Sequence, residues 1–244
     1  MAEVAARKNI AQGETDPRTR LVWDLPVRLT HWLLVLAVAG SYATHRLGAA
    51  AFRYHRWCGY AALVLVAARC AWGFLGPRHA RFASFVRGPR TVLRYLIELA
   101  RGRAAAFAGH NPAGGWMVLL LLALLLGQAV TGLFANDTIA DTGPLYGYVM
   151  GPTSDQLTRW HHRLFDALMI AVALHVIAVG AHLLARKTNL VMPMLTGRKP
   201  ASDVGADEAI VSSRSGRWLL LLAVAGATLA VIIERAPEAS LFAF

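Results

Sequence analysis

Four histidines lie within one long apolar stretch of the chain, residues 159–187: His161, His162, His175 and His182. An imidazole buried in hydrocarbon without a partner costs free energy, so a plain lipid-facing helix would avoid such residues. On a helix of 3.6 residues per turn, positions 14 apart share a face and lie about 21 Å apart along the axis. His161 and His175 have this spacing, whereas His162 and His175 point well away from each other. The 14-residue pair therefore fits two separate sites, each taking a second axial imidazole from another helix, as a haem iron requires.

Histidines on two other apolar stretches match this pair in depth. If successive helices alternate in direction, His55 opens the second apolar stretch at the level of His161, and His31 in the first stretch lies at the level of His175. However, His31 and His45 are also 14 residues apart. Ligation of one haem by 31 with 175 and of the other by 45 with 161 satisfies the same geometry. Spacing alone does not choose between His45 and His55.

The remaining polar residues of the apolar stretches have ordinary interpretations as well as chemical ones. His182 lies on the face of His175 and competes for the inner site, but its position near the end of the stretch favours an interfacial role. His45, His79 and His182 are expected to serve packing or hydrogen bonding, and His110 is expected to be a solvated loop residue. Arg69 lies 14 residues beyond His55, at the depth of the inner haem. It is expected either to pair with a haem propionate or to extend to the membrane interface.

Composition identifies the class of protein that must position these residues. Of 244 residues, 56% are hydrophobic and only 16% charged, and the mean hydropathy is +0.45, which is too apolar for an ordinary soluble domain. Five apolar runs approach the length of about 20 residues that a helix needs to cross a bilayer. These runs cover residues 29–46, 56–75, 116–134, 161–184 and 218–233. The sequence predicts an all-α membrane protein with five transmembrane helices, the first four carrying or flanking the histidines and the fifth at the C-terminus.

Four segments follow from this division of the chain. Residues 1–27 are expected to form a cytoplasmic N-terminal arm, without the apolar region of a cleaved signal peptide. Residues 28–197 form the predicted four-helix domain that carries the histidines, residues 198–217 a polar linker, and residues 218–244 the last helix with a short tail. Arginines alternate with apolar residues in RFASFVRGPRTVLRYLIELARGR (81–103), a pattern that predicts a segment lying along the cytoplasmic interface.

Basic residues predict the orientation. The N-terminal arm, the 78–103 loop and the 186–217 loop carry five, seven and six of them, against six on the opposite side. By the positive-inside rule the N-terminus is cytoplasmic and the C-terminus lies on the opposite side of the membrane, in a multi-pass protein. This rule also explains the net charge of +11, so nucleic acid is not an expected partner. Cys58 and Cys70 form no CxxCH motif, which excludes covalent haem attachment by that motif.

Several motifs, taken in order, resemble the bacterial cytochrome b561 family, which includes the b-type cytochrome subunits of membrane-bound nickel-iron hydrogenases. They are VWDLPVRLTHW, HRWCGYAALVLVAARCAWGFLG, GHNPAGGW and NLVMPMLTGRK, together with the spacing of His161 and His175. The resemblance covers about residues 21–200. It implies a four-helix transmembrane haem bundle, a di-haem cytochrome b domain over residues 28–197, in the bacterial inner membrane with the C-terminus periplasmic. The two haems b are non-covalent, and their iron ligands are His31, His55, His161 and His175, which favours His55 over His45.

The resulting functional hypothesis is one-electron transfer across the membrane. Bis-histidine ligation fills both axial positions of an iron, which suits electron transfer and leaves no open site for oxygen chemistry. Candidate partners are quinone or quinol, a periplasmic c-type cytochrome, and a dehydrogenase or hydrogenase subunit, so a role in a quinol-linked oxidoreductase stays open. The alternatives are a transporter or proton relay, and an anchoring subunit without chemistry. A transporter would be expected to show inverted repeats or broken helices, and the sequence has neither.

Overall fold

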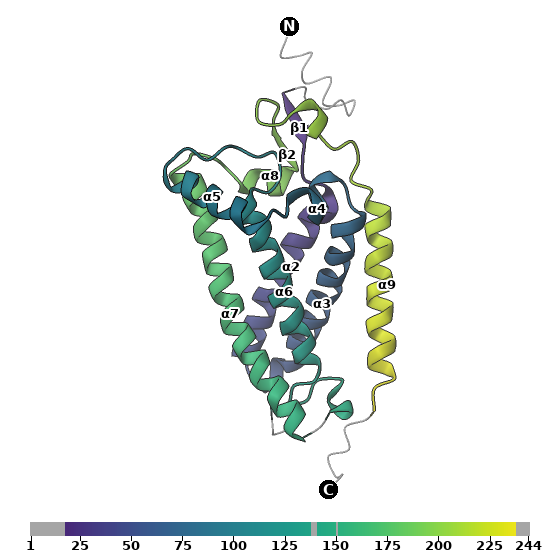
Figure 1. Cartoon of the computed structure of the whole chain (residues 1–244). Coiled ribbons are helices and arrows are strands. Elements are labelled where there is room, and N and C mark those ends of the chain that lie inside the picture. Colours follow the sequence, from purple (N-terminus) through teal and green to yellow (C-terminus); the bar gives the residue numbers. More distant parts are fainter. Residues whose placement is uncertain (1–17, 138–140, 150, 238–244) are drawn as a thin grey trace.

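The computed structural model describes residues 18–137, 141–149 and 151–237 (Figure 1). Five of its helices are long and apolar enough to cross a membrane, which confirms the predicted all-α membrane class. They are α2 (Leu25–Arg46), α3 (Phe52–Leu75), α6 (Pro112–Leu133), α7 (Gly151–Leu184) and α9 (Ser215–Glu234).

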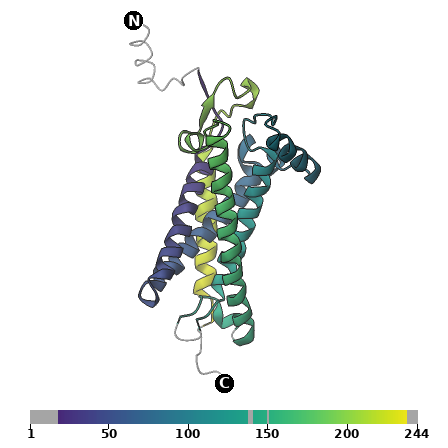
Figure 2. The ribbon, with the colours of Figure 1, turned by 90° about the vertical axis from the view of Figure 1, so that its left-hand side faces the viewer.

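Helices α2, α3, α6 and α7 run side by side, and α9 packs on the outside of α3 (Figures 1 and 2). The contacts join α2 to α3, α3 to α6 and α6 to α7, whereas the backbones of α2 and α7 approach each other less closely. The centre of the bundle is an apolar cluster formed by Val66, Leu122, Leu125 and Leu168. The lengths and packing of these helices therefore leave the histidine-bearing faces of α2 and α7 opposite each other.

Short elements are gathered mainly at one end of the bundle, here called the cap end. They are β1 (Thr19–Leu21), η2 (Arg78–Ala80), α4 (Phe82–Phe85), α5 (Pro89–Ala100), α8 (Val191–Thr196), β2 (Arg198–Pro200) and η4 (Ala206–Glu208). The opposite end, called the loop end, carries η1 (Ala49–Ala51) and η3 (Tyr146–Tyr148). At the cap end β1 pairs antiparallel with β2, with Arg20 opposite Lys199. The segment expected to be a plain polar linker thus begins with a strand that ties the N-terminal segment to the end of α8.

A buried carboxylate starts the first helix. The side chain of Asp24, 1% exposed, accepts hydrogen bonds from the backbone N–H of Val27 at 2.8 Å and from Nε1 of Trp72 at 3.2 Å. The first bond caps α2, since the leading N–H groups of a helix have no partner within it. The second joins α2 to α3. Burial raises the pKa of Asp24, while these two hydrogen bonds and the charge of Arg69 act in the opposite direction.

Helix α7 starts ten residues before the predicted apolar run. Its polar first turns are held by the chain that follows α6: the hydroxyl of Ser154 donates to the carbonyl of Phe134 at 2.7 Å, and the side-chain amide of Asn136 donates to Ser154 at 2.7 Å. The backbone N–H of Asn136 also donates to the hydroxyl of Thr158 at 3.0 Å. An apolar run does not include these polar turns, so the hydropathy pattern predicted a start of the helix that is too late.

Candidate functional site

Two pairs of imidazole rings face each other inside the bundle, at different levels. His31 on α2 and His175 on α7 have ring centroids 6.4 Å apart, nearer the cap end. His55 on α3 and His161 on α7 have ring centroids 6.3 Å apart, nearer the loop end. The structure thus brings together His31 with His175 and His55 with His161, which is one of the two arrangements that helical depth allowed. All four rings are half-buried.

The separation within each pair suits one metal atom held between two imidazoles. A metal–nitrogen bond of about 2.0 Å, added to roughly 1.1 Å from nitrogen to ring centre, puts two opposed centroids about 6 Å apart. Among the described residues no three His, Cys, Asp or Glu side chains come together in a way that would hold a metal ion by themselves. Two protein ligands per site are what a haem needs, because the porphyrin supplies the other four. The residues present therefore fit haem.

Backbone carbonyls fix the tautomers of the pair near the loop end. Nδ1 of His55 lies 2.9 Å from the carbonyl oxygen of Ser41, and Nδ1 of His161 lies 2.9 Å from that of Gln128. A carbonyl only accepts hydrogen bonds, so each Nδ1 carries the proton and each Nε2 presents a lone pair. Metal-binding histidines commonly show this arrangement, in which the second ring nitrogen donates to a carbonyl and fixes the ring.

Helix α6 holds His161 with Gln128, a residue that the sequence interpretation did not single out. The side-chain amide of Gln128 lies 3.1 Å from Nε2 of His161, and its Oε1 is buried without a hydrogen-bond partner. Gly132 lies against the ring, since a Cβ there would come 2.9 Å from Cε1 of His161. The signal for Gln128 was its amide group in an otherwise apolar helix. Binding of iron at Nε2 requires this amide to turn aside.

Space is also available beside His55. Gly59 lies one turn further along α3 on nearly the same face, and a Cβ built there meets no atom within 4 Å. By contrast, a Cβ at Gly40 would lie 2.9 Å from Sγ of Cys58, so that glycine allows α2 and α3 to pack closely. A flat macrocycle is easier to place beside an open glycine than beside a side chain.

The pair near the cap end has a different environment. Nδ1 of His31 is buried and has no hydrogen-bond partner. The ring of His31 packs edge-on against Trp32, with centroids 4.9 Å apart. An unpartnered buried nitrogen costs free energy unless a ligand or water satisfies it, which makes this pair a candidate binding site in its own right.

The competing histidines lie in other surroundings. His45 is exposed, as is His162, and the His45 ring lies 6.1 Å from that of His55. His182 is half-buried at the cap end of α7, where the backbone N–H of Thr188 donates to its carbonyl. Among the described residues, no side-chain hydrogen bond to a backbone carbonyl orients the ring of His45 or of His182.

Arg69 is buried between the bundle and the cap, with 6% of its surface exposed. Its Nη1 donates to the carbonyl of Ala80 at 3.3 Å, and its guanidinium lies over the ring of Phe82, 5.4 Å from the centroid. The negative charge of Asp24 attracts this guanidinium. Partners within the protein therefore already hold this arginine at the cap end.

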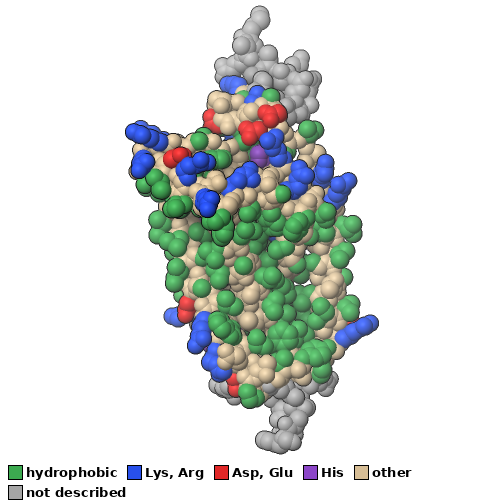
Figure 3. All heavy atoms as spheres, in the orientation of Figure 1, with side chains coloured by type: hydrophobic (Ala, Val, Ile, Leu, Met, Phe, Trp, Pro, Cys, Tyr) green, Lys and Arg blue, Asp and Glu red, His purple; other side chains and the backbone are tan. Residues whose placement is uncertain are grey.

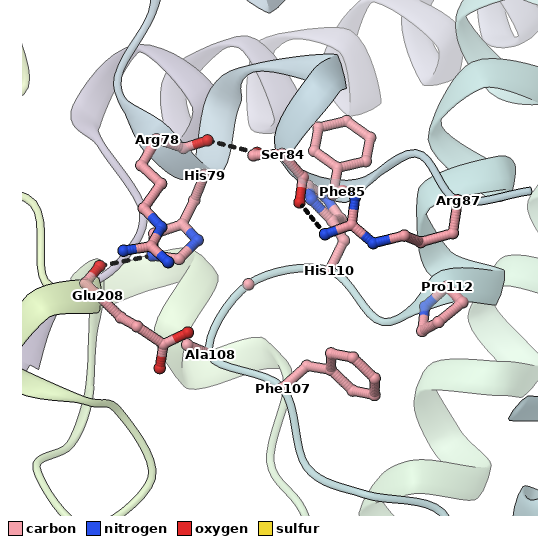
Figure 4. Close-up of a pocket in the computed structure, with 11 residues that line it drawn as sticks. Arg78, His79, Ser84, Phe85, Arg87, Phe107, Ala108, His110, Pro112 and Glu208 are labelled. Atoms are coloured by element: carbon pink, nitrogen blue, oxygen red, sulfur yellow. Dashed lines mark hydrogen bonds between the residues drawn. The ribbon is translucent and has the colours of Figure 1, made fainter. Parts of the chain in front are cut away.

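A cavity of about 130 Å³ lies in the cap itself, outside the bundle (Figure 4). At its edge Nε2 of His79 donates to the carbonyl of Glu208 at 2.8 Å, so His79 has the hydrogen-bonding role expected for it. His110 is not the solvated loop residue that the sequence suggested. The centroid of its ring lies 4.6 Å from that of Trp23 and 4.4 Å from that of Phe85, and its Nδ1 is buried.

The correction at His110 follows from folding of the loop against the cap. Burial lowers the pKa of His110 to about 3, and the nearby charges of Arg69, His79 and Lys199 act in the same direction. Burial also lowers the pKa of His79. His110 is thus neutral at neutral pH, and we assign it a packing role.

The family model of prokaryotic cytochrome b561 matches residues 22–197, which include all four facing histidines. The chain belongs to the prokaryotic cytochrome b561 family. It is therefore a multi-pass membrane protein and a b-type cytochrome of electron transport, and the resemblance seen in the sequence is confirmed.

The sequences of individual relatives align with this cytochrome over most of their lengths. A protein of Bradyrhizobium diazoefficiens is 25% identical, over 83% of this chain and 94% of its own. A protein of Azotobacter vinelandii is 27% identical, over 82% of this chain and 98% of its own. Both are named probable Ni/Fe-hydrogenase B-type cytochrome subunits. No solved structure gives a significant match.

Proposed function

We propose that this cytochrome carries single electrons across the membrane through two haems b. His31 and His175 hold the inner haem, and His55 and His161 hold the outer haem. The observation that carries the proposal is the pair of facing rings at each of two levels, 6.4 Å and 6.3 Å apart. Haem b, when bound, supplies a one-electron iron couple.

The protein's own part is to hold each imidazole and to exclude water. The carbonyls of Ser41 and Gln128 keep the Nε2 atoms of the outer ligands unprotonated and aimed, and they raise the basicity of those rings. The apolar cluster around Val66 and Leu168 fills the bundle between the two levels. In this proposal Arg69 adds positive charge near the inner haem, where it offsets propionate charge without giving up its contact with Ala80.

The proposed partners follow from the family and the relatives. A hydrogenase or a related dehydrogenase passes electrons to the outer haem, and quinone in the membrane takes them from the inner haem. The relatives' names support the first partner. A periplasmic c-type cytochrome is the alternative partner at the outer side.

The proposal is tested with the purified full-length protein. We expect a Soret band, dithionite-reducible b-type bands and two haems per chain by pyridine haemochrome. Addition of a short-chain quinone to the reduced protein is expected to reoxidise both haems. A folded protein without haem would overturn the proposal. Two haems that stay reduced in the presence of quinone would overturn the quinone step alone.

A second expected result concerns orientation. We propose that the cap end is cytoplasmic, because most basic residues lie there (Figure 3). Reporter fusions at the N-terminus and between residues 78 and 103 should read cytoplasmic, and a fusion at the C-terminus should read periplasmic. A periplasmic result for the 78–103 loop would invert the assignment of inner and outer haem.

A further inference from the structure

Helix α5 crosses the cap end instead of running along the bundle (Figures 1 and 2). It packs against α6, and Tyr95 on its protein-facing side is 5% exposed. Val92 and Leu99, three residues before and four after Tyr95, are half-buried on the same side. One face of α5 is therefore fixed to the protein, and its remaining surface is free.

A second face of α5 is apolar and exposed. Leu93, Leu96 and Ile97 are 61%, 45% and 42% exposed, and they lie within about 100° of one another around the helix. The transmembrane helices beside α5 present an apolar outer surface, and Figure 3 shows hydrophobic side chains just below the basic groups at this end of the molecule. The exposed face of α5 therefore adjoins the apolar belt of the bundle.

A third face is basic. Arg90, Arg94 and Arg101, the C-cap residue, fall within about 40° of one another, next to Ile97. In the part of the chain that the structure describes, no hydrogen bond or ion pair engages these three side chains. Two neighbouring arginines at the cap end, by contrast, are already engaged: Arg87 donates to the carbonyl of Ser84 at 2.8 Å and Arg186 to that of Ala104 at 2.9 Å.

We propose that α5 is a docking surface for anionic phospholipids of the membrane leaflet at the cap end, with Arg90, Arg94 and Arg101 binding their phosphate groups. An interfacial helix buries its apolar face at the boundary of the acyl chains and leaves basic side chains at the headgroups. Around α5 the face that contacts the protein is followed by the apolar face and then by the basic face. Guanidinium groups bind phosphate with paired, charge-assisted hydrogen bonds, and the three free arginines have donors available.

Lipid fits this surface better than a protein partner because the apolar face continues the belt that the bilayer itself covers. Charge selects among lipids: α5 contains one acidic residue, Glu98, and the side chains beyond its ends include Arg87 and Arg103. Each basic side chain near an anionic leaflet contributes about 1 kcal/mol, so two of them amount to about 30-fold in affinity. This inference does not depend on the proposed electron transfer.

The test uses the full-length, haem-loaded protein in a neutral detergent. Native mass spectrometry follows binding of phosphatidylglycerol, with phosphatidylcholine as the zwitterionic comparison. We expect Arg90→Gln/Arg94→Gln to bind phosphatidylglycerol about 30-fold more weakly than the parent and phosphatidylcholine equally well. Arg90→Lys/Arg94→Lys is expected to keep most of the preference, since it retains the charge.

A matched control removes two arginines from the other end, Arg46→Gln/Arg235→Gln, and should bind phosphatidylglycerol as the parent does. Equal affinity of the parent and Arg90→Gln/Arg94→Gln would overturn the proposal, and so would an equal loss in the control. Displacement of the lipid by the same concentration of inorganic phosphate would also overturn it, by showing a site for soluble anions. If the first variant loses haem, Arg94→Gln/Arg101→Gln replaces it in the same comparison.

Discussion

Replacement of His175 by alanine is expected to reduce the haem content from two to one per chain. His31 would then hold the inner iron from one side only, and its buried Nδ1 has no protein partner to keep the ring in place. The outer pair should survive, because the carbonyls of Ser41 and Gln128 hold its two rings independently of His175. The two levels are about 21 Å apart by helical rise, so the space left by the missing His175 side chain need not disturb the outer pair.

The measurement is pyridine haemochrome content at equal protein, together with a redox titration that resolves two components in the parent and one in the variant. His182→Ala is the matched control, since it removes another histidine of α7 and should keep both haems. His31→Ala should lose the same redox component as His175→Ala. Loss of both haems from a His175→Ala protein that stays folded would contradict the two-site proposal.

Helical arithmetic was enough to match His31 with His175 and to narrow the partner of His161 to His45 or His55, because a membrane helix is regular and has a known rise. His161 and His175 share a face for the same reason that any residues 14 apart do, and alternation of the helices brought His31 and His55 to the matching levels. The apolar runs also located the five long helices to within a few residues, except at the polar start of α7.

Contacts between distant segments were beyond the reach of periodicity. Nothing in the local sequence around His110 shows that Trp23 and Phe85 enclose it, because those residues come from different parts of the chain. The pairing of β1 with β2 involves only three residues on each strand, too few for a pattern. The carbonyls of Ser41 and Gln128 accept hydrogen bonds from His55 and His161. Every residue has a backbone carbonyl, so side-chain identity gives no sign of these bonds.

These carbonyl contacts bear on the choice that spacing left open, and they support His55 as the outer ligand. The Nδ1 proton of His55 is bound by Ser41, as a metal ligand's second nitrogen commonly is, and the ring faces His161 at 6.3 Å. His45 is exposed at the end of α2, and no side-chain hydrogen bond orients its ring among the described residues. A mobile, solvated imidazole loses more entropy on binding iron than one that is already held.

We therefore expect His55→Ala to lose one haem per chain and His45→Ala to keep both. The two rings are 6.1 Å apart, so the substitutions disturb the same region of the protein and control for each other. The lost component should be the one that His175→Ala retains, and the double variant His55→Ala/His175→Ala should contain no haem. If His45→Ala loses a haem while His55→Ala keeps two, the outer ligands come from α2 and α7. In that case the hydrogen bond from His55 to Ser41 serves only to pack α3 against α2.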